Sequence, residues 1–327
     1  MNYRHLGKSG LKISELSLGS WVTYQNQVDV EKAKTILKTA FDLGVNFFDN
    51  AEGYMQGKSE EIMGDALLQL GIPREQYLIS TKVFRGGNTP NELGLSRKHI
   101  IEAVNRSLKR FHTDYIDLVY AHAQDKDCPI EETVWAFNEV IRQGKAFYWG
   151  TSNWNAQDIA EATAIAEKHN WLPPSMEQPQ YNLLHRNRVE KEFTPLYEYP
   201  GIGLTTYSPL ASGVLTGKYN GGAVPEGSRA TVVAYQWMRE SVLDRSKIAT
   251  AEKLVPIAAE LGVTLAQMSL AWLLKNPNVS SIITGASRPE QVAENMKAID
   301  VVSLLSDEVL ARIDSALSGF REEPDED

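Results

Sequence analysis

Four side chains able to carry acid–base chemistry follow apolar segments of this 327-residue sequence. Asp49 ends one such segment, and Tyr54 follows it by five positions. Lys82 and His122 each end a later apolar segment. If the segments are neighbouring parallel strands, their carboxyl ends meet at one edge, and the four side chains come together there. The spacing therefore predicts one site that holds a carboxylate, a phenol, an ammonium and an imidazole.

The four groups complement one another as an acid–base set. A phenol has an ordinary pKa of about 10, which is too high for easy proton donation near neutrality. We expect the Lys82 ammonium to favour the phenolate of Tyr54 and so to lower its pKa, while Asp49 keeps Lys82 charged and oriented. His122 can donate a hydrogen bond to a substrate oxygen on which negative charge develops. Such a site suits the reduction of a carbonyl, in which a hydride reaches carbon while a proton reaches oxygen.

Each residue also has a purely structural interpretation. An aspartate and a lysine at strand ends often form only an ion pair, and a single histidine or loop tyrosine is commonly a packing residue. A hydrolase that uses Asp49 and Glu52 as paired carboxylates is disfavoured, because Lys82 would neutralise Asp49. The remaining histidines and the single cysteine, Cys128, show no metal-ligand spacing, so we expect no metal.

The elements that must position these residues alternate between strands and helices. Eight strand segments are predicted: Glu15–Leu18, Val45–Phe48, Leu78–Lys82, Ile116–His122, Ala146–Thr151, Ser175–Gln178, Gly203–Tyr207 and Ser280–Ile283. Helical periodicity separates them, for example after Asp29 and over Glu60–Leu70, Ser96–Phe111, Ile130–Gln143 and Asn155–Lys168. Such an alternation predicts a single α/β domain, a (β/α)8 TIM barrel, with functional groups at the carboxyl ends of its strands.

Further segments are added to this repeat. Tyr3–Leu6 and Leu11–Ile13 flank a turn-rich tetrad and predict an N-terminal β-hairpin that covers one end of the barrel. A long insert runs from Leu210 to about Lys247, and an extra C-terminal helix is expected over Asp307–Leu317. We expect one domain over residues 1–320 and an acidic, disordered tail over residues 321–327.

Composition limits the class of partner. The net charge of -9 and the pI near 5.3 argue against a nucleic-acid partner, which requires a basic surface. No segment approaches the roughly 18 apolar residues of a membrane span, so we expect no membrane insertion. The start of the chain lacks the apolar core of a signal peptide, and the lone cysteine cannot form an intrachain disulfide, so we expect a cytoplasmic location.

A hydride donor needs a binding site, and the usual dinucleotide fingerprint is missing. Gly201 and Gly203 form a Gly-x-Gly, but they precede a strand instead of following one. The triplet Gly57-Lys58-Ser59 is similar to the end of a P-loop, but the glycine required five positions earlier is Glu52. A nicotinamide cofactor would therefore bind at the barrel mouth by other means.

Ordered motifs over most of the chain resemble those of the aldo-keto reductase superfamily. They are Phe48-Asp49, Ala51-Glu52-Gly53-Tyr54, Ser80-Thr81-Lys82, Ile116-Asp117-Leu118 running to His122, Gly150-Thr151-Ser152-Asn153-Trp154, Glu177-Gln178 with Tyr181-Asn182, Tyr207-Ser208-Pro209-Leu210, and Gly285-Ala286-Ser287 with Gln291 and Glu294-Asn295. The resemblance runs from Tyr3 to about Leu317. Within the superfamily, further segments resemble the branch of the voltage-gated potassium channel β subunits and their soluble relatives: Gly94–Ile101, Ala146–Ser152, Ser208–Gly213 and Tyr235-Gln236-Trp237.

The resemblance implies a set of residues that bind NADPH/NADP+. It places the nicotinamide carboxamide on Ser152, Asn153 and Gln178 and stacks its ring on Tyr207. Ser20, Trp21 and Gln27 match positions along the cofactor and substrate cleft, and Asp49 also faces the cofactor. The loop over the pyrophosphate matches Ser208, Pro209, Leu210, Ser212, Gly213, Lys218 and Arg229. The adenosine end matches Gly285, Ser287, Arg288, Gln291, Glu294 and Asn295, where a helix N-terminus suits a 2′-phosphate and favours NADPH over NADH.

Two functions follow from this resemblance. The first is an NADPH-dependent reductase of small aldehydes and ketones, with Tyr54 as the proton donor. The alternative is a cofactor-bound regulatory subunit of a membrane channel with little turnover. Animal channel subunits have asparagine where this chain has His122, the residue of active reductases, which favours the enzyme. The resemblance also implies a homotetramer, and Trp21, Tyr24, Phe84 and Trp237 are expected to line the substrate pocket.

Overall fold

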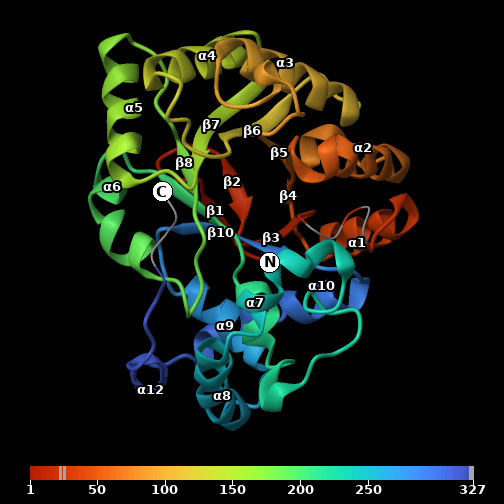
Figure 1. Cartoon of the computed structure of the whole chain (residues 1–327), viewed down its shortest axis with the longest axis vertical. Coiled ribbons are helices and arrows are strands. Elements are labelled where there is room, and N and C mark those ends of the chain that lie inside the picture. Colours follow the sequence, from red (N-terminus) through yellow and green to blue (C-terminus); the bar gives the residue numbers. More distant parts are fainter. Residues whose placement is uncertain (22–23, 25–26, 324–327) are drawn as a thin grey trace.

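The computed structural model describes residues 1–21, 24 and 27–323. In this part of the chain, eight parallel strands close into a barrel in the order β10-β3-β4-β5-β6-β7-β8-β9 (Figure 1). The strands are β3 (Leu16–Gly19), β4 (Phe47–Asp49), β5 (Leu78–Val83), β6 (Ile116–Ala121), β7 (Ala146–Ser152), β8 (Met176–Gln178), β9 (Gly203–Thr206) and β10 (Val279–Gly285). The predicted (β/α)8 barrel is confirmed.

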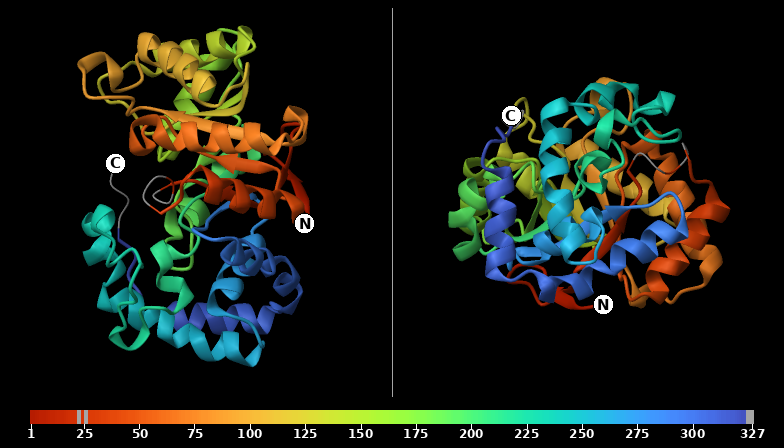
Figure 2. Two further views of the ribbon diagram at one scale, coloured as in Figure 1. Left: turned by 90° about the vertical axis from the view of Figure 1, so that its right-hand side faces the viewer. Right: turned by 90° about the horizontal axis from the view of Figure 1, so that it is seen from below.

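Helices surround the strands (Figure 2). They are α1 (Val30–Asp42), α2 (Lys58–Leu70), α3 (Arg97–Arg110), α4 (Ile130–Arg142), α5 (Ala156–Lys168), α6 (Thr194–Glu198), α7 (Arg239–Val242), α8 (Arg245–Glu260), α9 (Leu265–Leu274), α10 (Pro289–Met296), α11 (Ala298–Val301) and α12 (Asp307–Leu317). In α1, Asp29 caps the first turn through the backbone N–H of Lys32, and the buried residues recur at helical spacing.

Helix α2 begins two residues earlier than predicted, at Lys58. Gly57, just before it, has a φ of 87°, and a Cβ there would lie 2.1 Å from Arg110 Cζ. Arg110 in turn binds Glu60 of α2 at 2.9 Å. The glycine allows the chain to turn from the Tyr54 loop directly into the helix under this arginine.

An N-terminal hairpin closes one end of the barrel. Strands β1 (Tyr3–His5) and β2 (Lys12–Ser14) pair antiparallel. Leu6, just after β1, and Ile13 of β2 share a buried apolar cluster with barrel residues Phe47, Leu118, Tyr120, Met176 and Ile283. The expected cover is confirmed, and the open mouth is the opposite one, at the carboxyl ends of the strands.

The barrel interior sets which residues face this mouth. Side chains alternate between the two faces of a strand. Phe47 and Tyr120 belong to the inner apolar cluster, so Asp49 and His122, each two residues further on, lie on the same inner face. The site is therefore formed by the final inward positions of several strands.

The insert and the C-terminal segment pack beside the barrel. The insert contains the 3-10 helices η5 (Ala211–Thr216), η6 (Asn220–Gly222) and η7 (Val233–Met238). Beyond α12, Glu322 accepts a hydrogen bond from the backbone N–H of Asn187, and Glu323 pairs with Lys247 at 2.7 Å.

Residues 324–327 lie outside the described residues, so a disordered tail stays a prediction. No single helix among the described residues is long and apolar enough to cross a membrane, although α8 and α9, bent by 90°, pass that test as a pair.

The contact between β7 and β8 leads to a prediction about stability. A Cβ on Gly150 would lie 2.1 Å from the Met176 carbonyl oxygen, whereas a Cβ on Gly10 would have no neighbour within 4 Å. We expect Gly150→Ala to lower the free energy of unfolding by about 1–3 kcal/mol, since β8 must move away. Gly10→Ala should change it by less than about 0.5 kcal/mol. Urea unfolding of both variants measures this, and equal stabilities would contradict the close packing of the two strands.

Candidate active site

A buried ion pair lies at the centre of the barrel mouth. Lys82 Nζ lies 2.6 Å from Asp49 Oδ2 and donates a second hydrogen bond to the Asn50 carbonyl oxygen at 2.8 Å. The other Asp49 oxygen accepts from Ser80 Oγ at 2.7 Å and from Gln178 Nε2 at 3.1 Å. Both charged side chains are almost fully buried. Such a pair is stable only when further hydrogen bonds satisfy it, as they do here.

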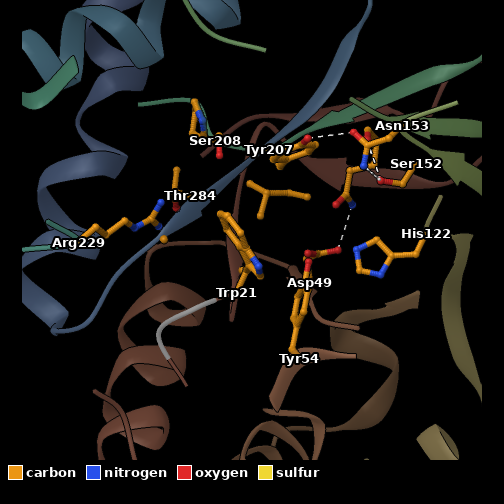
Figure 3. Close-up of a pocket in the computed structure, with 15 residues that line it drawn as sticks. Trp21, Asp49, Tyr54, His122, Ser152, Asn153, Tyr207, Ser208, Arg229 and Thr284 are labelled. Atoms are coloured by element: carbon orange, nitrogen blue, oxygen red, sulfur yellow. Dashed lines mark hydrogen bonds between the residues drawn. The ribbon is translucent and has the colours of Figure 1, made fainter. Parts of the chain in front are cut away.

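Tyr54 lies beside this pair. Its phenol oxygen is 3.1 Å from Lys82 Nζ. Its ring meets the His122 ring edge-on with centroids 5.7 Å apart (Figure 3). Tyr54 opens the short helix η1 (Tyr54–Gly57), in which Met55 and Gln56 take left-handed backbone angles. These angles return the loop toward the mouth. The structure thus brings together the four residues that the sequence predicts to converge.

Burial sets the protonation states of three of these groups. It raises the pKa of Tyr54 well above its ordinary value, and the Asp49 charge raises it further. Burial lowers the pKa of Lys82 against the attraction of Asp49. Burial, followed by the charges of Lys82 and Arg85, lowers the pKa of His122 well below its ordinary value. At neutral pH, Tyr54 therefore holds its proton and His122 is uncharged.

The predicted lowering of the Tyr54 pKa is wrong. The sequence indicates that Lys82 lies near Tyr54, but it does not show how far burial disfavours the phenolate. Neutral His122 carries a single ring proton, and its buried Nδ1 makes no hydrogen bond with the described residues.

A cavity of about 210 Å³ opens beside Tyr54 and His122. A second cavity of about 290 Å³ adjoins it and shares Ser208, Pro209, Arg229 and Gly285 as lining residues. The two form one elongated cleft that leads from the buried ion pair to the N-terminus of α10. Its length suits an extended ligand with chemically different ends.

Polar groups line the inner end of the cleft (Figure 3). Ser152 Oγ donates to the Gln178 carbonyl oxygen at 2.9 Å, and Asn153 Nδ2 contacts Ser152 Oγ at 3.3 Å. The Tyr207 hydroxyl donates to Asn153 Oδ1 at 2.9 Å. Asn153 has a left-handed φ of 58°, an unusual conformation that often occurs at functional sites. The inner end thus offers amide and hydroxyl groups together with an aromatic ring.

Cations gather at the outer end of the cleft. Within the described part of the chain, Lys218, Arg229 and Arg288 form no ion pair with a carboxylate. Burial of the Lys218 amine, followed by the charges of the two arginines, lowers its pKa to about 8. Gly213 has a φ of 102°, and a Cβ there would lie 2.6 Å from Lys218 Nζ. Only a glycine at position 213 leaves room for the Lys218 amine. The three cations together suit a polyanion.

The adenosine-end residues surround the start of α10. Arg288 is the N-cap residue, and Gln291 Oε1 accepts from the Ser287 backbone N–H at 2.8 Å. Glu294 and Asn295 line the cavity further along the helix. A helix N-terminus and an arginine together attract a phosphate.

Most of the predicted binding residues line this cleft. Trp21 lines the inner cavity, whereas Gln27, Leu210 and Ser212 line the outer one. Ser20 lines neither cavity: it is buried, and its Oγ donates to the Asp49 carbonyl oxygen at 3.2 Å. A sequence match does not separate a lining residue from one directly behind it.

Two residues of the site have no predicted role: Ser80, which holds Asp49, and Thr284, which lines the inner cavity. The alternation of strand side chains could have identified Ser80, because it lies two residues before Lys82 on the same face.

Among the residues expected to form the pocket walls, the rings of Trp21 and Trp237 meet edge-on with centroids 6.2 Å apart, whereas Tyr24 is buried. No group of His, Cys, Asp or Glu side chains within the described ranges is placed to hold a metal ion.

Comparison with known proteins agrees with this geometry. The model of the aldo/keto reductase family matches residues 15–318. A protein of Arabidopsis thaliana named "Probable voltage-gated potassium channel subunit beta" is 54% identical over 325 residues, covering 99% of each chain. A protein of Oryza sativa subsp. japonica with the same name is 53% identical over 317 residues, covering 97% of each chain.

The buried ion pair gives the prediction for this site. We expect Lys82→Met to lower the free energy of unfolding by about 3–5 kcal/mol, because it leaves the Asp49 carboxylate buried without its counter-charge. The double variant Lys82→Met with Asp49→Asn should recover part of this loss, since no charge then remains buried. Chemical denaturation followed by circular dichroism tests both. A Lys82→Met variant as stable as the wild type would contradict the importance of the pair.

Proposed function

The chain belongs to the aldo/keto reductase family, and from that membership we propose that it reduces small aldehydes and ketones to alcohols with NADPH as the reductant. Membership of this family supports an oxidoreductase role in general. The observation that carries the specific proposal is the 3.1 Å contact between the buried Lys82 ammonium and the Tyr54 phenol at the edge of an open cavity.

The cleft has the donor set that a nicotinamide dinucleotide requires. Ser152, Asn153 and Gln178 supply amide and hydroxyl groups for the carboxamide, and the Tyr207 ring supplies a stacking face. Lys218 and Arg229 neutralise the pyrophosphate beneath the loop that follows β9. When bound, the reduced nicotinamide supplies a hydride to the carbonyl carbon.

The residues of the chain handle the oxygen of the substrate. The neutral His122 donates its ring N–H to the carbonyl oxygen and orients it. As that oxygen becomes an alkoxide, the Tyr54 O–H bond breaks and its proton passes to the oxygen, giving the alcohol. An alkoxide is a much stronger base than a phenolate, so the raised pKa of Tyr54 does not prevent this transfer. Lys82 stabilises the phenolate left behind, and Asp49 holds Lys82 in place.

A second candidate function comes from the relatives. Their names describe potassium channel subunits, so a cofactor-bound regulatory subunit with little turnover is the alternative proposal. Both candidates bind the cofactor, whereas only the first consumes it. His122 beside Tyr54 favours turnover, because it offers a ring nitrogen to the substrate oxygen. The homotetramer stays a prediction.

The proton donor is tested by removing one hydroxyl group. Tyr54→Phe keeps the ring and should keep the affinity for NADPH, measured by fluorescence titration. Its rate of NADPH consumption with 4-nitrobenzaldehyde or methylglyoxal should fall by about 10²-fold or more, the usual scale for loss of a general acid. Unchanged turnover would remove Tyr54 from this role. A wild-type protein that binds NADPH but consumes none with a panel of carbonyls would favour the regulatory candidate.

The cofactor preference is tested at Arg288. Loss of a charge-assisted contact to the 2′-phosphate should raise the KM for NADPH of Arg288→Ala by about tenfold or more and leave the KM for NADH unchanged. Arg142→Ala, which removes an exposed arginine of α4, is the matched control and should change neither the KM for NADPH nor the KM for NADH. An equal rise in both KM values for Arg288→Ala would contradict a 2′-phosphate site at α10.

A further inference from the structure

One buried carboxylate at the barrel mouth has no part in the proposed reaction. Glu177 is fully buried in β8, directly before Gln178. Neither of its carboxylate oxygens makes a hydrogen bond of full geometry with any residue in the described ranges, although the Thr151 hydroxyl and the backbone N–H groups of Asn153 and Trp154 are close enough to affect its pKa. A buried carboxylate with such weak partners is costly, so its presence at this position calls for a physical reason.

Glu177 lies on the face of β8 that points away from the barrel interior. Gln178 reaches Asp49 inside the barrel, and neighbouring side chains of a strand point to opposite faces. In the register of β7 and β8, Thr151 pairs with Glu177 and Ser152 pairs with Gln178. The Thr151 hydroxyl is also buried and makes no hydrogen bond with the described residues. Glu177 is therefore behind the cavity wall and does not touch a ligand in the cleft.

Several groups surround this carboxylate. Burial raises the pKa of Glu177 to about 8, against the opposing effects of the Thr151 hydroxyl, the Arg188 guanidinium and the backbone amides of Asn153 and Trp154. At neutral pH, Glu177 is thus mostly a neutral acid that has one O–H to donate and one oxygen to accept.

These neighbours belong to the turn that carries the inner polar groups of the cleft. Asn153 takes its left-handed conformation in this turn. Arg188, buried in the π-helix η4 (Arg188–Glu192), approaches the Asn153 carbonyl oxygen at 3.5 Å from outside the barrel. From inside, the Tyr207 hydroxyl and Ser152 Oγ contact the Asn153 side chain. The turn is thus held from both faces of the barrel wall.

We propose that Glu177 is a positioning residue which, together with Arg188, supports the turn from Ser152 to Trp154 and so presents Ser152 and Asn153 to the carboxamide of the bound nicotinamide. This inference rests on the proposed function. It assigns to the outer face of β8 a role in the affinity for one end of the cofactor only. Glu177 and Arg188 adjoin the turn that lines the inner cavity, whereas Lys218 and Arg288, which suit the phosphates, line the outer one.

Two probes that differ in the nicotinamide test this inference. NADPH carries it, and 2′-phospho-ADP-ribose lacks it but keeps both phosphate sites. We expect Glu177→Ala to weaken NADPH binding by about tenfold or more, which corresponds to roughly 1.4 kcal/mol, and to change 2′-phospho-ADP-ribose binding by less than about twofold. Glu177→Gln resembles the neutral acid and should stay within about threefold of the wild type for both probes at pH 7. Binding is measured by calorimetry.

Asp117→Ala is the matched control. Asp117 is also a buried carboxylate beside an arginine, Arg74, but it lies near the amino end of β6, away from the mouth. The Asp117→Ala variant should have a lower melting temperature than the wild type and the same affinity for NADPH. If Glu177→Ala does not fold, Arg188→Met, which removes the contact to Asn153, should show the same selective loss.

Other outcomes would overturn the inference. Wild-type affinity for NADPH in both Glu177→Ala and Arg188→Met would do so, as would equal losses for the two probes. A wild-type protein that binds no NADPH would instead refute the proposed function, and this inference with it.

Discussion

The attraction between Lys82 and Asp49 is the constraint on which the rest of the site depends. The attraction between two buried charges offsets their loss of hydration only when every remaining donor and acceptor is satisfied. Here the Asn50 carbonyl, Ser80 and Gln178 complete the pair, so its geometry is fixed by β4, β5 and β8 together. The fixed ammonium then sets the position at which a phenolate can be stabilised, and Tyr54 occupies that position.

The barrel makes this arrangement possible through parallel pairing and strand alternation. The hairpin fills one end with apolar side chains, which leaves the last inward positions of the strands to face a single open mouth. Polar residues at those positions are Asp49, Lys82, Ser152 and Gln178. Loops then add what the strands cannot supply: Tyr54 on the inner side, and Lys218 and Arg229 at the outer end of the cleft.

Much of this could be predicted from the sequence, because strand ends carry their own signal. An apolar run that closes on Asp49 or Lys82 locates the mouth, and repeated alternation of strands and helices identifies the barrel. Quantities that depend on depth could not be predicted. The direction of the Tyr54 pKa shift depends on burial, and Ser20 lies behind the cavity wall. Glu177 and Gln178 are neighbours in the sequence, but their side chains point to opposite faces of β8.

In the function that we propose, the buried pair and its phenol serve a hydride-transfer reduction. The most direct measurement incubates the protein with 4-nitrobenzaldehyde and NADPH that carries deuterium at both positions of the nicotinamide C4, and then examines the product by NMR. We expect 4-nitrobenzyl alcohol with one deuterium on its carbinol carbon. Deuterium-free alcohol, or no alcohol although the cofactor binds, would contradict this expectation.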